Sequence, residues 1–241
     1  ELVLTSPVQE IQFFGANVLH SKVRKEWCTF PAESRGPAFN TLRDLLLESL
    51  RKNPSSGGLV PARLCLALGA AAAQQADALS EFVSTALSVG SGDQGAQGSF
   101  VAMSMLSALP DEMEQLAPTP SAEGSPSARP SAHDLLGFLP SVVGLLERLI
   151  GTGASETPSA SVQRAGFVCL RTWTALAPES MSLRTLYTTY PRLAEALLRA
   201  LEAQDTVQAA ADALCEACTL DVFVLTLDPA DVSLAAAMSG G

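Results

Sequence analysis

The feature that most constrains this chain is a series of segments with apolar residues in helical spacing, separated by short polar, glycine or proline breaks. Apolar residues three or four positions apart lie on one face of an α-helix. Nine segments follow this pattern, over residues 7–26, 38–52, 60–74, 76–89, 96–109, 134–151, 160–176, 183–202 and 206–221. No segment shows a convincing strand alternation; the short apolar run 223–227 allows a strand, but a lead into a further helix is preferred. The pattern therefore predicts an all-α fold.

The helical segments group into hairpins of two. The second members of the hairpins are predicted to be 7–26, 60–74, 96–109, 160–176 and 206–221. They recur irregularly, with a rough mean near the 40–47 residues of HEAT and armadillo repeats. We therefore predict an α-solenoid, a HEAT/armadillo-like superhelix of stacked helical hairpins.

Residues 110–133 interrupt the helical pattern. They are rich in proline, serine and alanine and have no apolar face, which predicts a flexible insertion. Because the hairpins resume afterwards, we prefer an insertion to a domain boundary. The expected organisation is N-terminal repeats over 1–109, the insertion over 110–133 and further repeats over 134–241. The chain begins in mid-pattern and ends in a Ser-Gly-Gly run, so we expect a solenoid truncated at both ends.

Composition narrows the functional class. The net charge is −10, and 47% of the residues are hydrophobic but only 5% aromatic, which suits close helix packing. An acidic chain repels phosphates, which argues against nucleic-acid binding, and suits a partner with a basic surface.

No signal peptide is evident, and no apolar run approaches the roughly 20 residues that span a bilayer. Five cysteines, most of them in apolar helical patterns, indicate reduced thiols in the cytosol or nucleus.

Segment 7–26 has two apolar faces and one polar stripe. The first apolar face carries Phe13, Ala16, His20, Val23 and Trp27. The second carries Ile11, Phe14 and Val18. The stripe carries Glu10, Asn17, Ser21 and Arg24. Two apolar faces predict neighbours on two sides, so the stripe would be the surface that remains exposed.

Such polar stripes on the second-member helices form the candidate protein-binding surface, although plain solvation explains any one of their residues as well. The candidates are Asn17, Ser21, Arg24, Arg63, Gln74, Gln97, Ser104, Arg164, Arg171, Gln208, Asp212 and Glu216. Trp27 and Trp173 are interpreted as packing anchors rather than binding residues.

Two motifs with chemical associations have structural explanations. The glycine run over 90–95 matches G-x-G-x-x-G, but a dinucleotide site needs a preceding strand, and residues 82–89 have helical spacing. We interpret the run as a turn between helices. Cys215 and Cys218 have redox-motif spacing, but no second pair or nearby histidine completes a zinc set. We interpret them as two small buried residues on one helix face.

The titratable residues do not predict an active site. His20 lies on an apolar face, where we expect packing at a helix interface and a hydrogen bond to a backbone carbonyl; His133 lies near a helix cap. Two distant histidines nearly exclude histidine-based triads and metal sites. Asp111 and Glu112 are interpreted as a solvated helix end rather than an acid–base pair. We therefore predict a protein that is not an enzyme and uses no cofactor or metal.

Several segments resemble karyopherins of the importin-β superfamily. Residues 12–22, QFFGANVLHSK, followed by Trp27, resemble the opening segment of that family, with the importin-13 and transportin-3 group nearest. The order of later segments agrees: leucine-rich residues 42–50, RLCLAL at 63–68, residues 106–112, and CLRTW at 169–173. The resemblance is most specific over the first 75 residues. It departs at the 110–133 insertion and at the start, where the family has one more helix.

The resemblance implies a nuclear transport receptor. Family members are HEAT superhelices whose inner N-terminal helices bind the GTP-bound form of the small GTPase Ran. They carry protein cargo and contact the Phe-Gly repeats of nucleoporins, so the expected location is both cytoplasm and nucleus. The alternative is a HEAT/armadillo scaffold for protein–protein interaction without a transport role.

Overall fold

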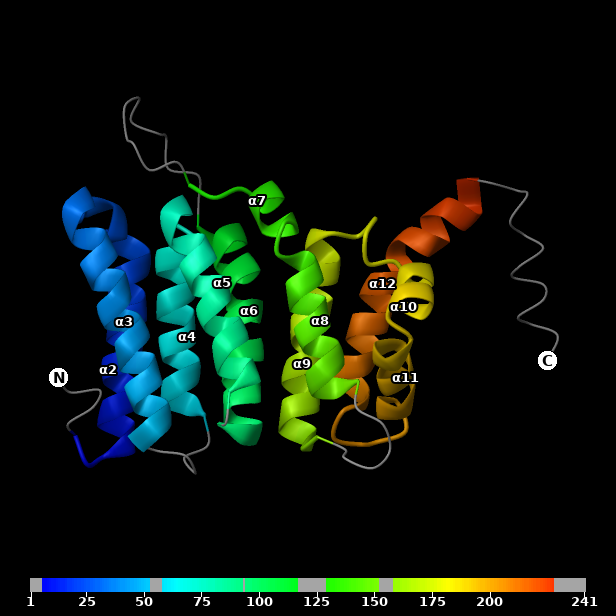
Figure 1. Cartoon of the computed structure of the whole chain (residues 1–241), viewed down its shortest axis with the longest axis horizontal. Helices are drawn as coiled ribbons and strands as arrows, with labels where there is room; N and C mark the ends of the chain where they lie inside the picture. The colour runs from blue at the N-terminus through cyan, green and yellow to red at the C-terminus, as the bar shows by residue number, and fades with distance from the viewer. Residues whose placement is uncertain (1–5, 53–57, 93, 117–128, 152–157, 228–241) are drawn as a thin grey trace.

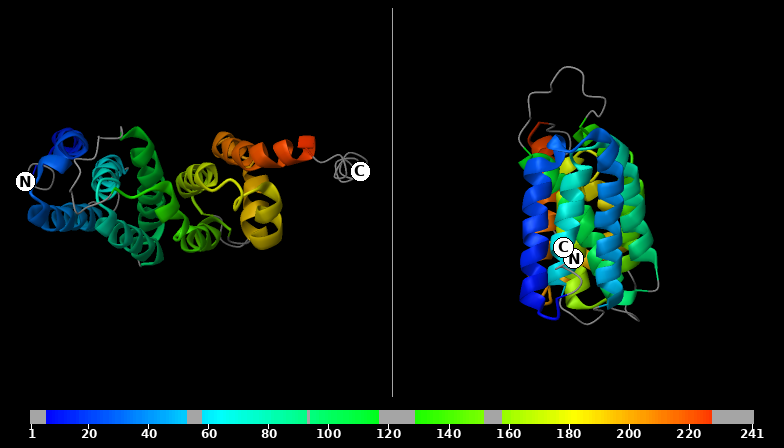
Figure 2. Two further views of the ribbon diagram at one scale, coloured as in Figure 1. Left: turned by 90° about the horizontal axis from the view of Figure 1, so that it is seen from above. Right: turned by 90° about the vertical axis from the view of Figure 1, so that its left-hand side faces the viewer.

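The described helices lie side by side in two rows that follow the long axis of the molecule (Figures 1 and 2). The computed structural model describes residues 6–52, 58–92, 94–116, 129–151 and 158–227. Side chains are described as far as Cys218. Within these ranges every regular element is a helix and none is a strand. The prediction of an all-α fold is therefore confirmed for the described part of the chain.

One row, here called the α2 row, contains the predicted second members of the hairpins. It consists of α2 (Gln9–Glu26), α4 (Leu59–Ala72), α6 (Gly95–Gln115), α9 (Ala160–Leu176) and α12 (Val207–Leu227). Each helix of this row packs against the next, in chain order. Residues 223–227 are the end of α12, which continues past its predicted limit at 221, so they form neither a strand nor the lead into a further helix.

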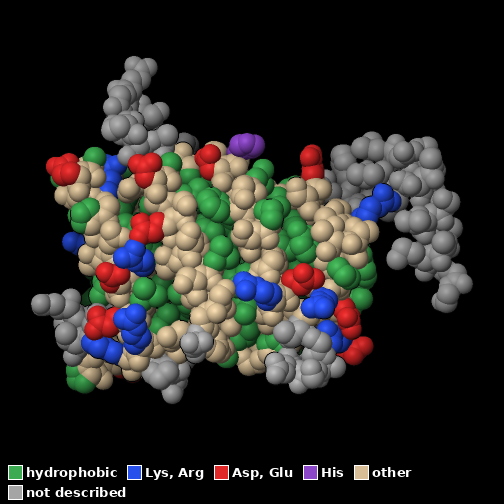
Figure 3. Space-filling view, in the orientation of Figure 1, with side chains coloured by type: hydrophobic (Ala, Val, Ile, Leu, Met, Phe, Trp, Pro, Cys, Tyr) green, Lys and Arg blue, Asp and Glu red, His purple; other side chains and the backbone are tan. Residues whose placement is uncertain are grey.

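The other row, the α3 row, pairs with the first. It consists of α3 (Ala32–Lys52), α5 (Ala76–Ser91), α8 (Leu139–Ile150), α10 (Leu183–Thr189) and α11 (Pro191–Ala200). The α3 row faces the viewer in Figures 1 and 3, and acidic and basic side chains are interspersed over it. A 3₁₀ turn (Trp27–Thr29) follows α2, and the short helix α7 (Ala132–Leu136) precedes α8.

Two predicted helices are each divided in the structure. Segment 134–151 forms α7 and α8, which begins with Pro140 in its first turn, where proline's missing N–H costs nothing. Segment 183–202 forms α10 and α11, divided at Tyr190. The proline that follows Tyr190 disfavours helical backbone there, and Tyr190 has φ −127° and ψ 58°.

Two other helices are longer than predicted. Helix α3 begins at Ala32 rather than at 38 and contains Pro37. Helix α6 continues through Pro110 to Gln115 instead of ending at 109. Pro110 has no N–H to donate to the carbonyl of Leu106, four residues earlier. The indole Nε1 of buried Trp173, on α9, donates to that carbonyl at 2.9 Å instead. Of the predicted insertion, residues 117–128 lie outside the described part.

The core lies between the two rows and consists mainly of alanine, leucine and valine. Close approach depends on small residues. A Cβ atom on Gly166 of α9 would lie 2.8 Å from Ile150 Cγ2 and 3.0 Å from Met103 Sδ, so glycine lets α8 and α6 both pack there. Trp27 and Trp173 are buried, which agrees with their prediction as packing anchors.

The second apolar face of α2 differs from its prediction. Ile11, Phe14 and Val18 are 43%, 66% and 40% exposed, so no described neighbour covers that face. Since α2 is the first described helix of its row, it packs on α4 but has no described helix on its other side.

None of the described helices is both long and apolar enough to cross a membrane.

Candidate functional site

The structure places most of the predicted stripe residues at the surface of the α2 row. The exposed ones are Ser21, Arg164, Arg171 and Gln208. The half-buried ones are Asn17, Arg24, Arg63, Gln97, Ser104, Asp212 and Glu216. The clearest stripe is on α9, where positions 161, 164, 168, 171 and 175 are all exposed, as helical spacing requires.

Gln74 is an exception, because it is buried and cannot belong to an exposed stripe. Its amide nitrogen donates to the carbonyls of Val23 (3.1 Å) and Ala70 (2.8 Å), and its amide oxygen accepts from Cys28 Sγ. The side chain therefore fastens the end of α4 to the end of α2. A polar residue near a helix end gives no sequence signal that distinguishes this role from solvation.

Arg24 takes part in a cluster that the sequence did not predict. Glu112 near the end of α6 is 2% exposed, which overturns its interpretation as part of a solvated helix end. Its Oε1 lies 2.8 Å from His20 Nε2, and its Oε2 lies 3.1 Å from Arg24 Nε. Oε2 accepts no well-aligned hydrogen bond, so Arg24 acts through its charge. His20 thus bonds a carboxylate, not the expected backbone carbonyl.

Four further stripe residues, Arg63, Arg171, Gln208 and Asp212, also have partners. The guanidinium of Arg63 lies 5.6 Å from the ring centroid of Phe13, a cation–π contact between α4 and α2. On α12, the Gln208 amide donates to Asp212 at 2.8 Å, and Asp212 also lies 4.0 Å from Arg171 of α9.

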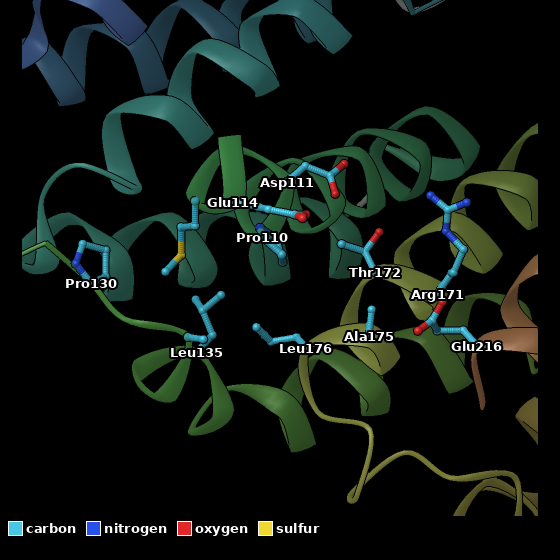
Figure 4. A pocket seen from close by; sticks show the side chains of 12 residues that line it. Pro110, Asp111, Glu114, Pro130, Leu135, Arg171, Thr172, Ala175, Leu176 and Glu216 are labelled. Carbon is cyan, nitrogen blue, oxygen red and sulfur yellow. The ribbon is translucent and has the colours of Figure 1, made fainter. Parts of the chain in front are cut away.

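A cavity of about 610 Å³ opens where α6 ends, between α7, α9 and α12 (Figure 4). Pro110, Met113, Leu135 and Leu176 supply apolar lining. Asp111 and Glu114 of α6, Arg171 of α9 and Glu216 of α12 supply the charges. Arg171 and Glu216 lie at one end of the cavity and Pro130 at the other (Figure 4). Two of the predicted residues, Arg171 and Glu216, are thus brought together.

Asp111 and Glu114 were missed as site residues, although a signal for Asp111 was present. Positions 97, 104 and 111 are seven apart and lie on one helix face, but the helix was predicted to end at 109. Burial raises the pKa of the Asp111 carboxyl above its ordinary value, and Glu114 and Glu112 act in the same direction, while Arg171 opposes them. A partly desolvated carboxylate of this kind is stabilised by a nearby cation.

A second, smaller depression of about 360 Å³ lies between α6 and α9, near the start of α9. Both helices also line the larger cavity, and the surface between α6 and α9 that contains the two hollows is here called the furrow. Phe100, Ser104 and Ser107 line it from α6, and Ser161, Arg164, Ala165 and Val168 line it from α9. The hydroxyls of Ser104 and Ser107 donate to the carbonyls of Phe100 and Met103 on their own helix. Arg164 is therefore the group here with a free charge to offer.

The glycine run lies where a turn was predicted. Helix α5 ends at Ser91 and α6 begins at Gly95, so a helix rather than a strand precedes the turn. This arrangement lacks the strand that a dinucleotide site requires.

The cysteines differ in accessibility, and none of the five is in a disulfide. Cys65 and Cys169 are buried, and burial raises the pKa of the Cys169 thiol to about 12. Cys218 is half-buried and Cys215 exposed, so the prediction that both are buried was wrong for Cys215. Within the described ranges no group of three histidine, cysteine, aspartate or glutamate side chains could hold a metal ion.

Comparison with protein-family models and with curated proteins finds no match to this chain.

Proposed function

We propose that the two rows are part of a HEAT/armadillo-type α-solenoid and that the chain belongs to a nuclear transport receptor of the karyopherin-β class. In this proposal the α2 row binds GTP-bound Ran, and the receptor carries protein cargo and contacts Phe-Gly nucleoporins. It would shuttle between cytoplasm and nucleus, and it would be a binding protein rather than an enzyme.

The observation that carries the proposal is the stacking order of the α2 row. The five helices of the α2 row pack one on the next, and each of them has exposed or half-buried residues of the predicted polar stripes. The helix with the most family-like residues, α2, stands at one end of this row, with Ser21 exposed and Asn17 half-exposed. That is the position from which the resemblance expects Ran to be bound.

The mechanism would be linkage between two ligands. Ran-GTP and cargo would prefer different curvatures, or overlapping parts, of the solenoid, so that binding of one lowers the affinity for the other. An array in which each unit touches mainly its neighbours accumulates small rotations over its length.

The test is capture of purified Ran by the immobilised protein, with Ran loaded with either GTP or GDP. We expect preferential capture of the GTP form. Ser21→Glu on the exposed surface of α2 should weaken capture, because Ran-GTP would contact that surface. Ser84→Glu, the same change at an exposed position of α5 in the other row, should leave capture unchanged.

Equal capture of both forms, or none, by protein with an unchanged helical circular-dichroism spectrum would contradict the transport role. The alternative of a scaffold for other proteins would then be the better explanation.

A further inference from the structure

We propose that the furrow between α6 and α9 binds an extended segment of a partner protein that carries one acidic and one basic side chain. The basic side chain enters the cavity lined by Asp111, Glu114 and Glu216, and the acidic one reaches Arg164. The inference rests on the proposed role of the α2 row as a protein-binding surface, and it adds the chemistry of the partner.

The cavity at the end of α6 has an excess of negative charge. Three carboxylates line it against one guanidinium, that of Arg171, and Asp212 lies 4.0 Å from that guanidinium on the other side. Among the described residues, Asp111, Glu114 and Glu216 have no ion-pair partner within 4.0 Å. The excess charge therefore favours a cationic side chain.

Among the described residues, Arg171 is the only lysine or arginine that lines the cavity. Residues 117–128, which join the two stretches that line the cavity, contain Glu123 but no lysine or arginine, and Arg129, which follows them, is not among the lining residues. The partly buried Asp111 carboxylate, whose pKa is raised, would gain most from a cation that excludes water. The apolar lining from Met113, Leu135 and Leu176 suits the aliphatic stem of a lysine or arginine.

The other end of the furrow has the opposite charge. Arg164 is exposed, no carboxylate lines its depression, and no described carboxylate pairs with it. An arginine in this setting favours a partner carboxylate, which it can bind with two parallel hydrogen bonds. Phe100 and Val168 supply apolar surface beside it.

The spacing between the two ends sets the spacing of the partner's charges. Arg164 lines the depression and Arg171 lines the cavity, and the two residues are seven apart on α9, so two helical turns, about 10 Å, separate them. An extended chain rises about 3.3 Å per residue, so its acidic and basic residues would stand about three positions apart. The acidic residue of the partner segment would lie toward the start of α9, and its basic residue would lie toward the end of α9.

Fluorescence anisotropy with capped, labelled peptides tests the inference. One peptide holds glutamate and arginine apart with two prolines, whose polyproline conformation spans about 9 Å over three residues. A second peptide has the same composition with the two charges adjacent, and two others lack one charge each. We expect the spaced peptide to bind roughly three- to tenfold more tightly than the other three, as partly exposed ion pairs of this strength allow.

Variants in which a charge in the furrow is reversed test the inference more sharply than the peptides alone. Arg164→Glu should weaken binding of the spaced peptide and strengthen binding of a peptide with arginine at both positions. The matched change Arg192→Glu, at an exposed position of α11, should alter neither affinity. Glu216→Lys should weaken the spaced peptide and strengthen one with two glutamates, with Glu195→Lys on α11 as its control.

Equal affinity for all peptides, or no response to charge exchange, would overturn the inference. The Ran-capture experiment alters only α2, at one end of the α2 row, and leaves the furrow between α6 and α9 unchanged. If the peptides bind without selectivity while Ran capture still depends on GTP, only the inference about the furrow is contradicted. If the peptides bind selectively but Ran capture does not depend on GTP, only the transport role is contradicted.

Discussion

At the scale of single residues, Gly166 shows how one missing methyl group sets the packing of three helices. Gly166→Ala would place a Cβ atom within 3.0 Å of atoms from Ile150 and Met103, and such overpacking costs about 1–3 kcal/mol. We expect a lower free energy of unfolding, measured by denaturant titration followed by circular dichroism.

Gly144 of α8 is the matched control, because a Cβ atom there would meet nothing within 4 Å. Gly144→Ala should stabilise the protein by up to about 1 kcal/mol through helix propensity. Equal effects of the two substitutions would show that α9 does not approach α8 and α6 as closely as described.

At the scale of helices, α6 continues past a proline because α9 supplies the missing hydrogen bond. Trp173→Phe keeps a large ring but removes the Nε1 donor, which leaves the buried Leu106 carbonyl without a partner. We expect a loss of about 1–3 kcal/mol in the free energy of unfolding. A double substitution with Pro110→Ala, which restores the helical N–H, should recover part of that loss. Full additivity of the two changes in unfolding experiments would argue against this coupling.

The ends of α2 and α6 are joined across α4 by a buried charge. Glu112→Gln keeps the shape of the side chain but removes the charge that pairs with Arg24, so we expect destabilisation by about 1–2 kcal/mol. Glu114→Gln, two residues later and exposed, should have an effect near zero. Thermal unfolding monitored by circular dichroism compares the two variants, and indistinguishable midpoints would contradict a structural role for the cluster.

Helix boundaries show where local sequence was sufficient and where it was not. The break at Tyr190 directly precedes Pro191, and Gly137 lies three residues before Pro140 in the first turn of α8. Both signals were local, although the helical spacing around them concealed the division. Pro110 gave an equally local signal to stop, and here that signal was misleading. The helix continues because Trp173, 63 positions after Pro110, donates a hydrogen bond to the buried Leu106 carbonyl that the proline cannot pair.

At the scale of the whole molecule, the helical spacing of apolar residues determined the element type and the pairing of the hairpins. Period and propensity are local properties, and they are repeated often enough here to predict the α2 row in order. The same spacing predicted the exposed stripe of α9, including Arg164 and Arg171, because a helix places residues seven apart on one face.

Only the tertiary structure decided which polar residues face solvent and which join distant helices. Gln74 and Glu112 have the same local signature as solvated residues, but partners 51 and 92 positions away bury them. The cavity at Asp111 likewise forms from four helices whose meeting no local pattern encodes. The sequence thus determined the helices and their faces by periodicity, whereas burial depends on contacts between segments far apart in the chain.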